Sequence, residues 1–118
     1  MNEMRIPLMQ TERRLQMLKA LSDESRLRLM LLIFSQKSLC VCELVDAVNL
    51  PQPTISRQLN ILKQAGLVDS ERRGKWMHYG LKSELEPWLQ ELLITSLPLA
   101  ASIIEQKSNW CLTEKKGC

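Results

Sequence analysis

Residues 52–67, QPTISRQLNILKQAGL, decide the fold of this chain. Three apolar residues, Ile55, Leu59 and Leu62, recur at the spacing that places them on one face of an α-helix. Pro53 fits the first helical turn, because the backbone N–H that proline lacks would have no intrahelical partner there. The stretch therefore predicts an amphipathic helix with one side turned to a core and the other free for a partner.

The opposite side of this predicted helix is polar. Its side chains can all donate hydrogen bonds: Thr54, Ser56, Arg57, Asn60, Lys63 and Gln64. A helix of this kind fits the major groove of DNA, where such side chains contact base edges and phosphates. We expect Gln52, Arg57 and Asn60 to contact bases. The hydroxyls of Thr54 and Ser56 are expected to reach phosphates.

Three shorter helices are predicted upstream of this candidate recognition helix. Leucines recur every three positions within residues 11–21, which predicts a first amphipathic helix. Ser22 is expected to N-cap a second, largely buried helix, and Ser38 to cap a short third one. Asn49 suits the left-handed conformation that ends a helix. Only a short connection then separates the third helix from the recognition helix.

The apolar pattern changes after Gly66 from helical periodicity to alternation. Residues 67–72 and 75–81 predict two short strands around a tight turn at residues 73–74, which together form a β-hairpin. Residues 87–97 then predict a further helix. Its continuation beyond Pro98 is expected to kink or to start a second segment that runs to about Gln106.

Positive charge is concentrated around the recognition helix and the hairpin. Residues 52–82 carry six basic and two acidic side chains, while the whole chain has a formal net charge of +3. Three of these cations lie at the hairpin tip: Arg72, Arg73 and Lys75. Such a patch indicates a polyanionic partner, with nucleic acid first. Two helices joined by a short turn and followed by a basic hairpin predict a winged helix-turn-helix, a mainly α fold that binds double-stranded DNA.

Length and composition exclude several other classes. A chain of 118 residues with 45% hydrophobic and 25% charged residues is typical of one soluble globular domain. The longest apolar run has six residues, whereas a membrane helix needs about 20. The amino-terminal stretch does not resemble a secretory signal, so we expect a cytoplasmic protein. No nucleophile–base pair, phosphate loop or catalytic carboxylate pair stands out, so we do not expect an enzyme.

Four cysteines in such a chain are more typical of metal binding or redox chemistry than of a disulfide framework. Cys40 and Cys42 lie at the start of the predicted third helix. In a regular helix, side chains at i and i+2 point about 200° apart, so both thiolates reach one ligand only if the backbone there is irregular. Thiolates prefer soft or borderline centres, and trivalent arsenic fits that preference. Two small buried core residues are the alternative interpretation.

Four runs of sequence together carry a family resemblance: LKALSDESRLRLMLLI (residues 18–33), LCVCELVDAV (39–48), QPTISRQLNILKQAGL (52–67) and GKWMHYGL (74–81). In this order, over roughly residues 12–97, they resemble the ArsR/SmtB family of bacterial metal-responsive repressors. Within that family the chain is most similar to the arsenic-responsive repressors of arsenical-resistance operons.

The resemblance implies a homodimeric repressor that binds a palindromic operator and dissociates when a metal or metalloid binds. In that family the terminal helices form the dimer interface, here residues 11–21 and 87–97. We therefore expect a DNA-binding and dimerisation domain over residues 1–106 and a cysteine-containing tail over residues 107–118. The expected function is repression of a metalloid-resistance operon, without a catalytic cofactor. Its inducer would be trivalent arsenic or antimony on cysteine thiolates.

The chain departs from the arsenic sensors that it resembles at Val45, where their Cys-Val-Cys-x-x-Cys pattern has a third cysteine. Arsenic bound by three sulfurs would then need another donor or a non-protein ligand. We expect Cys111 as this third ligand, with Cys118 as the alternative, either within one subunit or across the dimer.

Other sensor types remain as alternatives. Cadmium and lead sensors of the family share the Cys-x-Cys pattern but add amino-terminal cysteines, and this chain has none before Cys40. Zinc and nickel sensors use histidine and carboxylate pairs on the last helix, and the single histidine here, His78 in the second hairpin strand, cannot build that site. We expect a structural or hydrogen-bonding role for His78. A thiol redox switch on the same fold is the remaining alternative.

Overall fold

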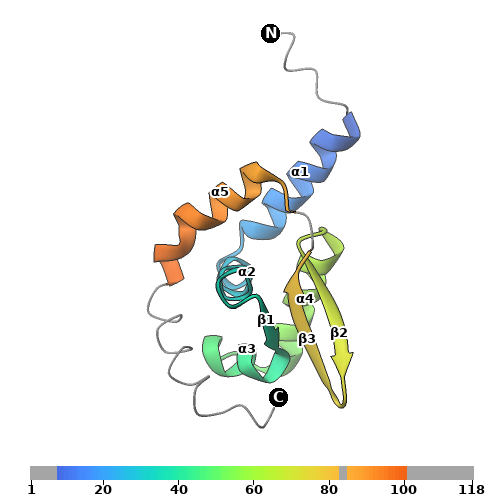
Figure 1. Cartoon of the computed structure of the whole chain (residues 1–118), viewed down its shortest axis with the longest axis vertical. Helices are drawn as coiled ribbons and strands as arrows, with labels where there is room; N and C mark the ends of the chain where they lie inside the picture. Colours follow the sequence, from blue (N-terminus) through green and yellow to red (C-terminus); the bar gives the residue numbers. More distant parts are fainter. Residues whose placement is uncertain (1–7, 83–84, 101–118) are drawn as a thin grey trace.

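The computed structural model describes residues 8–82 and 85–100 as a mainly helical fold with one small antiparallel sheet. In chain order its elements are α1 (Leu8–Leu21), α2 (Glu24–Gln36), β1 (Ser38–Cys40), α3 (Val41–Val48), α4 (Gln52–Gln64), β2 (Val68–Arg73), β3 (Trp76–Leu81), α5 (Pro87–Ser96) and the short 3-10 helix η2 (Leu97–Ala100). Figure 1 shows α2 in the middle, with α1 and α5 above it and α3 below it. The predicted fold class is confirmed.

Helix α2 forms the centre of the core. Residues 29–33 are all fully buried. Five consecutive positions point in every direction around a helix axis, so α2 is enclosed on all sides. Each buried leucine, isoleucine or methionine side chain stabilises the fold by about 1.5–3 kcal/mol relative to an exposed one. The other elements are therefore arranged around this helix.

The predicted N-cap of α2 is wrong by one residue. The N-cap is Asp23, whose carboxylate accepts a hydrogen bond from the Arg26 N–H at 3.2 Å. Ser22 instead ends α1, because its hydroxyl donates to the carbonyl of Lys19 at 2.7 Å. Both residue types are good N-caps, and the two-residue connection between α1 and α2 assigns them to different helices.

The predicted cap at Ser38 is also wrong, because this residue begins a strand. Strand β1 pairs antiparallel with β3, so the sheet order is β1-β3-β2. The register joins Ser38 to Gly80, Leu39 to Tyr79 and Cys40 to His78. A Cβ at Gly80 would lie 3.0 Å from the carbonyl oxygen of Lys37, so glycine permits this close approach. Cys40 replaces Ser38 as the N-cap of α3.

The other predicted elements are present with small shifts of their ends. Helix α1 begins at Leu8 instead of Thr11, and the last predicted helix ends at Ser96, followed by η2, which begins at Leu97 and contains Pro98. The second segment expected up to Gln106 lies mostly outside the described residues. None of the helices within residues 8–82 and 85–100 is long and apolar enough to cross a membrane.

The turn between α3 and α4 depends on Asn49, which adopts the predicted left-handed conformation with φ of 59°. A residue with a Cβ is disfavoured there by about 1–2 kcal/mol, and asparagine tolerates the conformation better than most. We expect Asn49→Ala to lower the free energy of unfolding by about 1 kcal/mol. Urea denaturation measures this change, with Asn49→Gly as the control that keeps wild-type stability. An alanine variant as stable as the glycine variant would contradict the prediction.

Candidate DNA interface and cysteine site

The polar side of α4 faces solvent. Its apolar side is fully buried through Ile55, Leu59 and Leu62. Four of the five side chains predicted to contact DNA from this helix are exposed: Gln52, Ser56, Arg57 and Asn60. Thr54 is half-buried. The helix therefore presents hydrogen-bond donors on the side away from the core, and the individual DNA contacts stay predictions.

A three-residue turn sets α4 against α3. The N–H of Asn49 donates to the carbonyl of Val45 at 2.9 Å and ends α3. The carbonyl of Pro51 then accepts from the N–H of Ile55 at 3.0 Å and starts α4. The two helices pack against each other. This arrangement is a helix-turn-helix, with α4 in the position of the recognition helix.

The wing is the β2–β3 hairpin, and its tip carries the predicted cations. All three are exposed: Arg72, Arg73 and Lys75. Arg73 lies 3.3 Å from the carboxylate of Glu71. An exposed ion pair of this type contributes about 0.2–1 kcal/mol, so a DNA phosphate can compete for the guanidinium. The wing is also tied to the recognition helix, because the Lys63 ammonium donates to the Ser70 hydroxyl at 2.7 Å.

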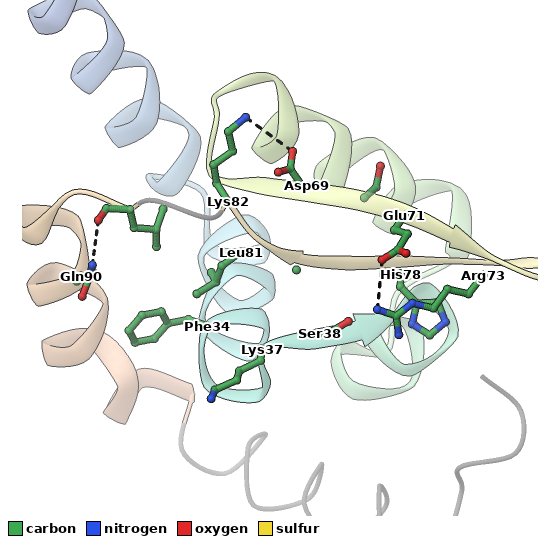
Figure 2. Close-up of a pocket in the computed structure, with 13 residues that line it drawn as sticks. Phe34, Lys37, Ser38, Asp69, Glu71, Arg73, His78, Leu81, Lys82 and Gln90 are labelled. Carbon is green, nitrogen blue, oxygen red and sulfur yellow. Dashed lines mark hydrogen bonds and ion pairs between the residues drawn. The ribbon is translucent and has the colours of Figure 1, made fainter.

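A cavity of about 800 Å³ lies beside the wing (Figure 2). Figure 2 shows the ion pair of Glu71 and Arg73 next to His78, and the ion pair of Lys82 and Asp69 further along the hairpin. The Nε2 atom of His78 is buried and has no hydrogen-bond partner among the described residues. Neither cysteine of the Cys-x-Cys pair lines this cavity.

The two cysteines of that pair converge where β1 ends and α3 begins. Cys40 has extended backbone angles, φ −75° and ψ 151°, and Cys42 lies in the first turn of the helix. Their Cα atoms are 5.3 Å apart, and the structure joins their sulfur atoms as a disulfide. The irregular backbone that two thiolates need to share one ligand is therefore present at Cys40. Sulfurs in this contact suit either a shared thiophilic ligand or oxidation.

Cys40 is also the N-cap of α3. Its Sγ accepts a hydrogen bond from the N–H of Cys42 at 3.2 Å, and its own N–H donates to the carboxylate of Glu43 at 2.9 Å. This is a capping box with cysteine in the place of serine or threonine. Cys40 is fully buried and Glu43 is 7% exposed. Sequence reasoning missed Glu43, although the spacing Cys-x-x-Glu is that of a capping box.

A third donor for this site is not found among the described residues. Val45 is half-buried one turn along α3. The predicted third ligand, Cys111, and its alternative, Cys118, lie outside residues 8–82 and 85–100. Within these ranges no group of three or more histidine, cysteine and carboxylate side chains is placed to hold a metal ion. His78 lies in the second strand of the hairpin, as predicted, directly across from Cys40.

Comparison with known proteins identifies the family. The model of the bacterial regulatory protein, arsR family, matches residues 23–70, from α2 into β2. The arsenic resistance transcriptional regulator ArsR2 of Pseudomonas putida is 48% identical over 79 residues, which cover 67% of this chain and 69% of that protein. This chain belongs to the ArsR family. The predicted resemblance is confirmed.

Further relatives agree with an ArsR-family regulator. The arsenical resistance operon repressor of Escherichia coli is 39% identical over 79 residues, 67% of this chain and 68% of that protein. The crystal structure of the AntR antimony-specific transcriptional repressor has a TM-score of 0.65 at 26% identity, covering 83% of this chain and 86% of that one. The chain is thus a DNA-binding transcriptional repressor of this family and not an enzyme, as predicted.

Two charge deletions distinguish base contacts from phosphate contacts in this ArsR-family repressor. Arg57→Ala is expected to reduce the preference for an operator over random duplex DNA by about 1–3 kcal/mol, because a contact to a base edge is lost. Lys75→Ala removes the same charge from the wing tip and is expected to weaken binding to all DNA alike. The salt dependence of the binding constant of Lys75→Ala should fall by an amount that corresponds to about one phosphate contact.

Fluorescence anisotropy measures both effects, with a site selected from a random duplex library and with a nonspecific duplex. If Arg57→Ala weakens both duplexes equally, the arginine contacts a phosphate and the predicted base contact is wrong.

Proposed function

We propose that this chain represses a metalloid-resistance operon and leaves its operator when arsenite or antimonite binds the thiolates of Cys40 and Cys42. The observation that carries this proposal is the convergence of the two sulfur atoms at the first turn of α3, directly before the recognition helix. Trivalent arsenic and antimony prefer sulfur donors. Relatives named for arsenical resistance, and the antimony-specific AntR, agree with this chemistry.

The position of the sulfurs supports a route from ligand to DNA. A ligand bound to Cys40 Sγ occupies the sulfur that accepts the capping hydrogen bond from Cys42. The first turn of α3 then loses its cap, and α3 shifts against α4, with which it packs. The shift misplaces the recognition helix. Thermodynamic linkage makes the effect mutual. The ligand lowers the affinity for the operator, and the operator lowers the affinity for the ligand by the same factor.

Exposed apolar side chains support the proposed homodimer. Four large hydrophobic residues on the terminal elements are 43–68% exposed: Leu15, Leu18, Ile94 and Leu99. Two of them come from α1 and the others from α5 and η2. A second copy of this chain would cover all three elements. A dimer on a palindromic operator would place its two α4 helices about 34 Å apart, in successive major grooves.

We propose that the chain consists of one domain and a carboxy-terminal tail. Residues 1–106 would form the DNA-binding and dimerisation domain, and residues 107–118 a tail that brings a third thiolate. We place the protein in the cytoplasm, where its operator DNA lies.

A thiol redox switch is the second candidate, favoured by the pairing of the same two sulfurs as a disulfide. In that case an oxidant such as a peroxide takes two electrons from the thiols, which release two protons and form the S–S bond. Anaerobic titration separates the two functions. Release of operator by arsenite under reducing conditions supports ligand sensing, whereas release by oxidant alone supports the redox switch.

The double variant Cys40→Ser and Cys42→Ser tests the sensing role directly. Serine keeps an N-cap oxygen at position 40, so we expect unchanged operator affinity but no release by arsenite. Anisotropy of labelled operator during an arsenite titration measures both quantities, and the wild-type protein is the control with normal release. Normal release from the double variant would refute thiolate sensing at this pair.

The third donor is tested by X-ray absorption of the arsenic complex. We expect three As–S bonds in the wild-type protein and two in Cys111→Ser, because one thiolate is lost. One arsenic per subunit is the expected stoichiometry in both. Three As–S bonds in both proteins would exclude Cys111 and leave Cys118 or a non-protein thiol as the donor.

A further inference from the structure

One partly buried arginine connects the end of α1 to the recognition helix. Arg26, in the first turn of α2, donates from Nε to the carbonyl of Ala20 at 2.7 Å. Its Nη1 donates to Oε1 of Gln58 at 2.8 Å. Ala20 lies in the last turn of α1, and Gln58 lies midway along α4. A single guanidinium therefore bridges the two helices.

We propose that Arg26 is a positioning residue for DNA recognition, which sets the orientation of α4 relative to α1. This inference rests on the proposed homodimer, in which α1 belongs to the interface. Because α1 would be fixed against its partner, the angle between α1 and α4 determines how far apart the two recognition helices lie. In this proposal Arg26 acts through α4 and contacts neither the DNA nor the inducer.

The chemistry of the bridge requires an arginine. The Ala20 carbonyl is one of the last four of α1, which have no intrahelical donor, and it carries part of the negative end of the helix dipole. A guanidinium satisfies it with one N–H while a second N–H, held at a fixed angle in the same plane, reaches Gln58. Lysine has a compact ammonium on a flexible stem and lacks this rigid fork.

Packing alone leaves the contact between α1 and α4 incomplete. A solvent-exposed groove of about 260 Å³ runs between them, lined by Gln16 and Lys19 of α1, by Arg26, and by Ile61 and Gln64 of α4. Close-packed helices hold their angle through interdigitated side chains. At this groove the polar bridge adds a directional contact that resists a change in the angle, beside the packing of both helices on α2.

In a dimer with a two-fold axis, a change in the angle between α1 and α4 changes the distance between the two recognition helices. If α4 tilts in each subunit, the two recognition helices move in opposite directions, so their separation changes by twice the single displacement. A palindromic operator detects this change, because both half-sites have to be occupied together. An isolated half-site does not detect it.

The experiment compares full operator with a single half-site. We expect Arg26→Lys and Gln58→Ala each to weaken binding to the full operator on the order of tenfold, because a charge-assisted hydrogen bond is lost. Half-site affinity and the salt dependence should stay at wild-type values. Gln58→Glu keeps an acceptor for Arg26, so its ratio of operator affinity to half-site affinity should equal that of wild type, while its added negative charge weakens binding to both DNAs. The double variant Arg26→Lys and Gln58→Ala should be no weaker than either single one.

The matched control is Arg28→Lys, on the same helix, because Arg28 pairs only with Glu24 of α2 in the described structure, at 2.6 Å, and connects no second element. Equal losses on operator and half-site, with a lower free energy of unfolding, would overturn positioning in favour of a general structural role. Equal losses at wild-type stability, with a salt dependence that falls by about one phosphate contact in Arg26→Ala, would overturn it in favour of a phosphate contact. Sedimentation velocity measures whether the wild-type protein is a dimer on the operator. A monomer there would overturn both the proposed homodimer and this inference, whereas the outcomes above concern Arg26 alone.

Discussion

The complete burial of α2 is the constraint on which the rest of the structure depends. Residues 29–33 are enclosed on every side, and α1, α3, α4, α5, β1 and β3 all contact this helix. A close-packed interior resists gradual deformation and moves between discrete arrangements. A signal that repositions α4 therefore acts at helix ends and turns, where individual polar contacts and backbone conformations fix the arrangement. The cap at Cys40, the turn at Asn49 and the bridge at Arg26 are three such places.

Helical periodicity predicted most of the fold because the core is built from helices with one buried face. Ile55, Leu59 and Leu62 are buried as their spacing indicates. Strand β1 could not be found in this way, since three residues are too few to show an alternating pattern. Its strand conformation comes from pairing with β3, which lies about 40 residues further along the chain. Wrong caps at Ser22 and Ser38 have the same origin, because a good cap residue acts only where the tertiary structure ends a helix.

The candidate site was predictable to different degrees. The exposed face of α4 follows from its polar residues, and the Cys-x-Cys pair follows from its spacing together with an irregular backbone. The capping role of Glu43 could have been predicted, because Glu43 follows Cys40 by three residues, the spacing of a capping box. The bridge from Arg26 to Gln58 was not, since the two residues are 32 positions apart and a polar contact between helices leaves no periodic trace.

Under the proposed function, the free energy that operator release requires can be compared with the free energy that an inducer at the cysteines makes available. Converting a population that is 99% competent for DNA into one that is 99% incompetent needs about 5.5 kcal/mol of differential binding. Loss of an N-cap supplies only about 0.5–2 kcal/mol. The cap at Cys40 cannot by itself account for release. Cys40 is also the last residue of β1 and pairs with His78 of the wing, so a displacement there acts on α3 and on the wing strand together. Two subunits on one operator double the cap contribution to about 1–4 kcal/mol, so the displacement of the wing strand has to supply the remainder.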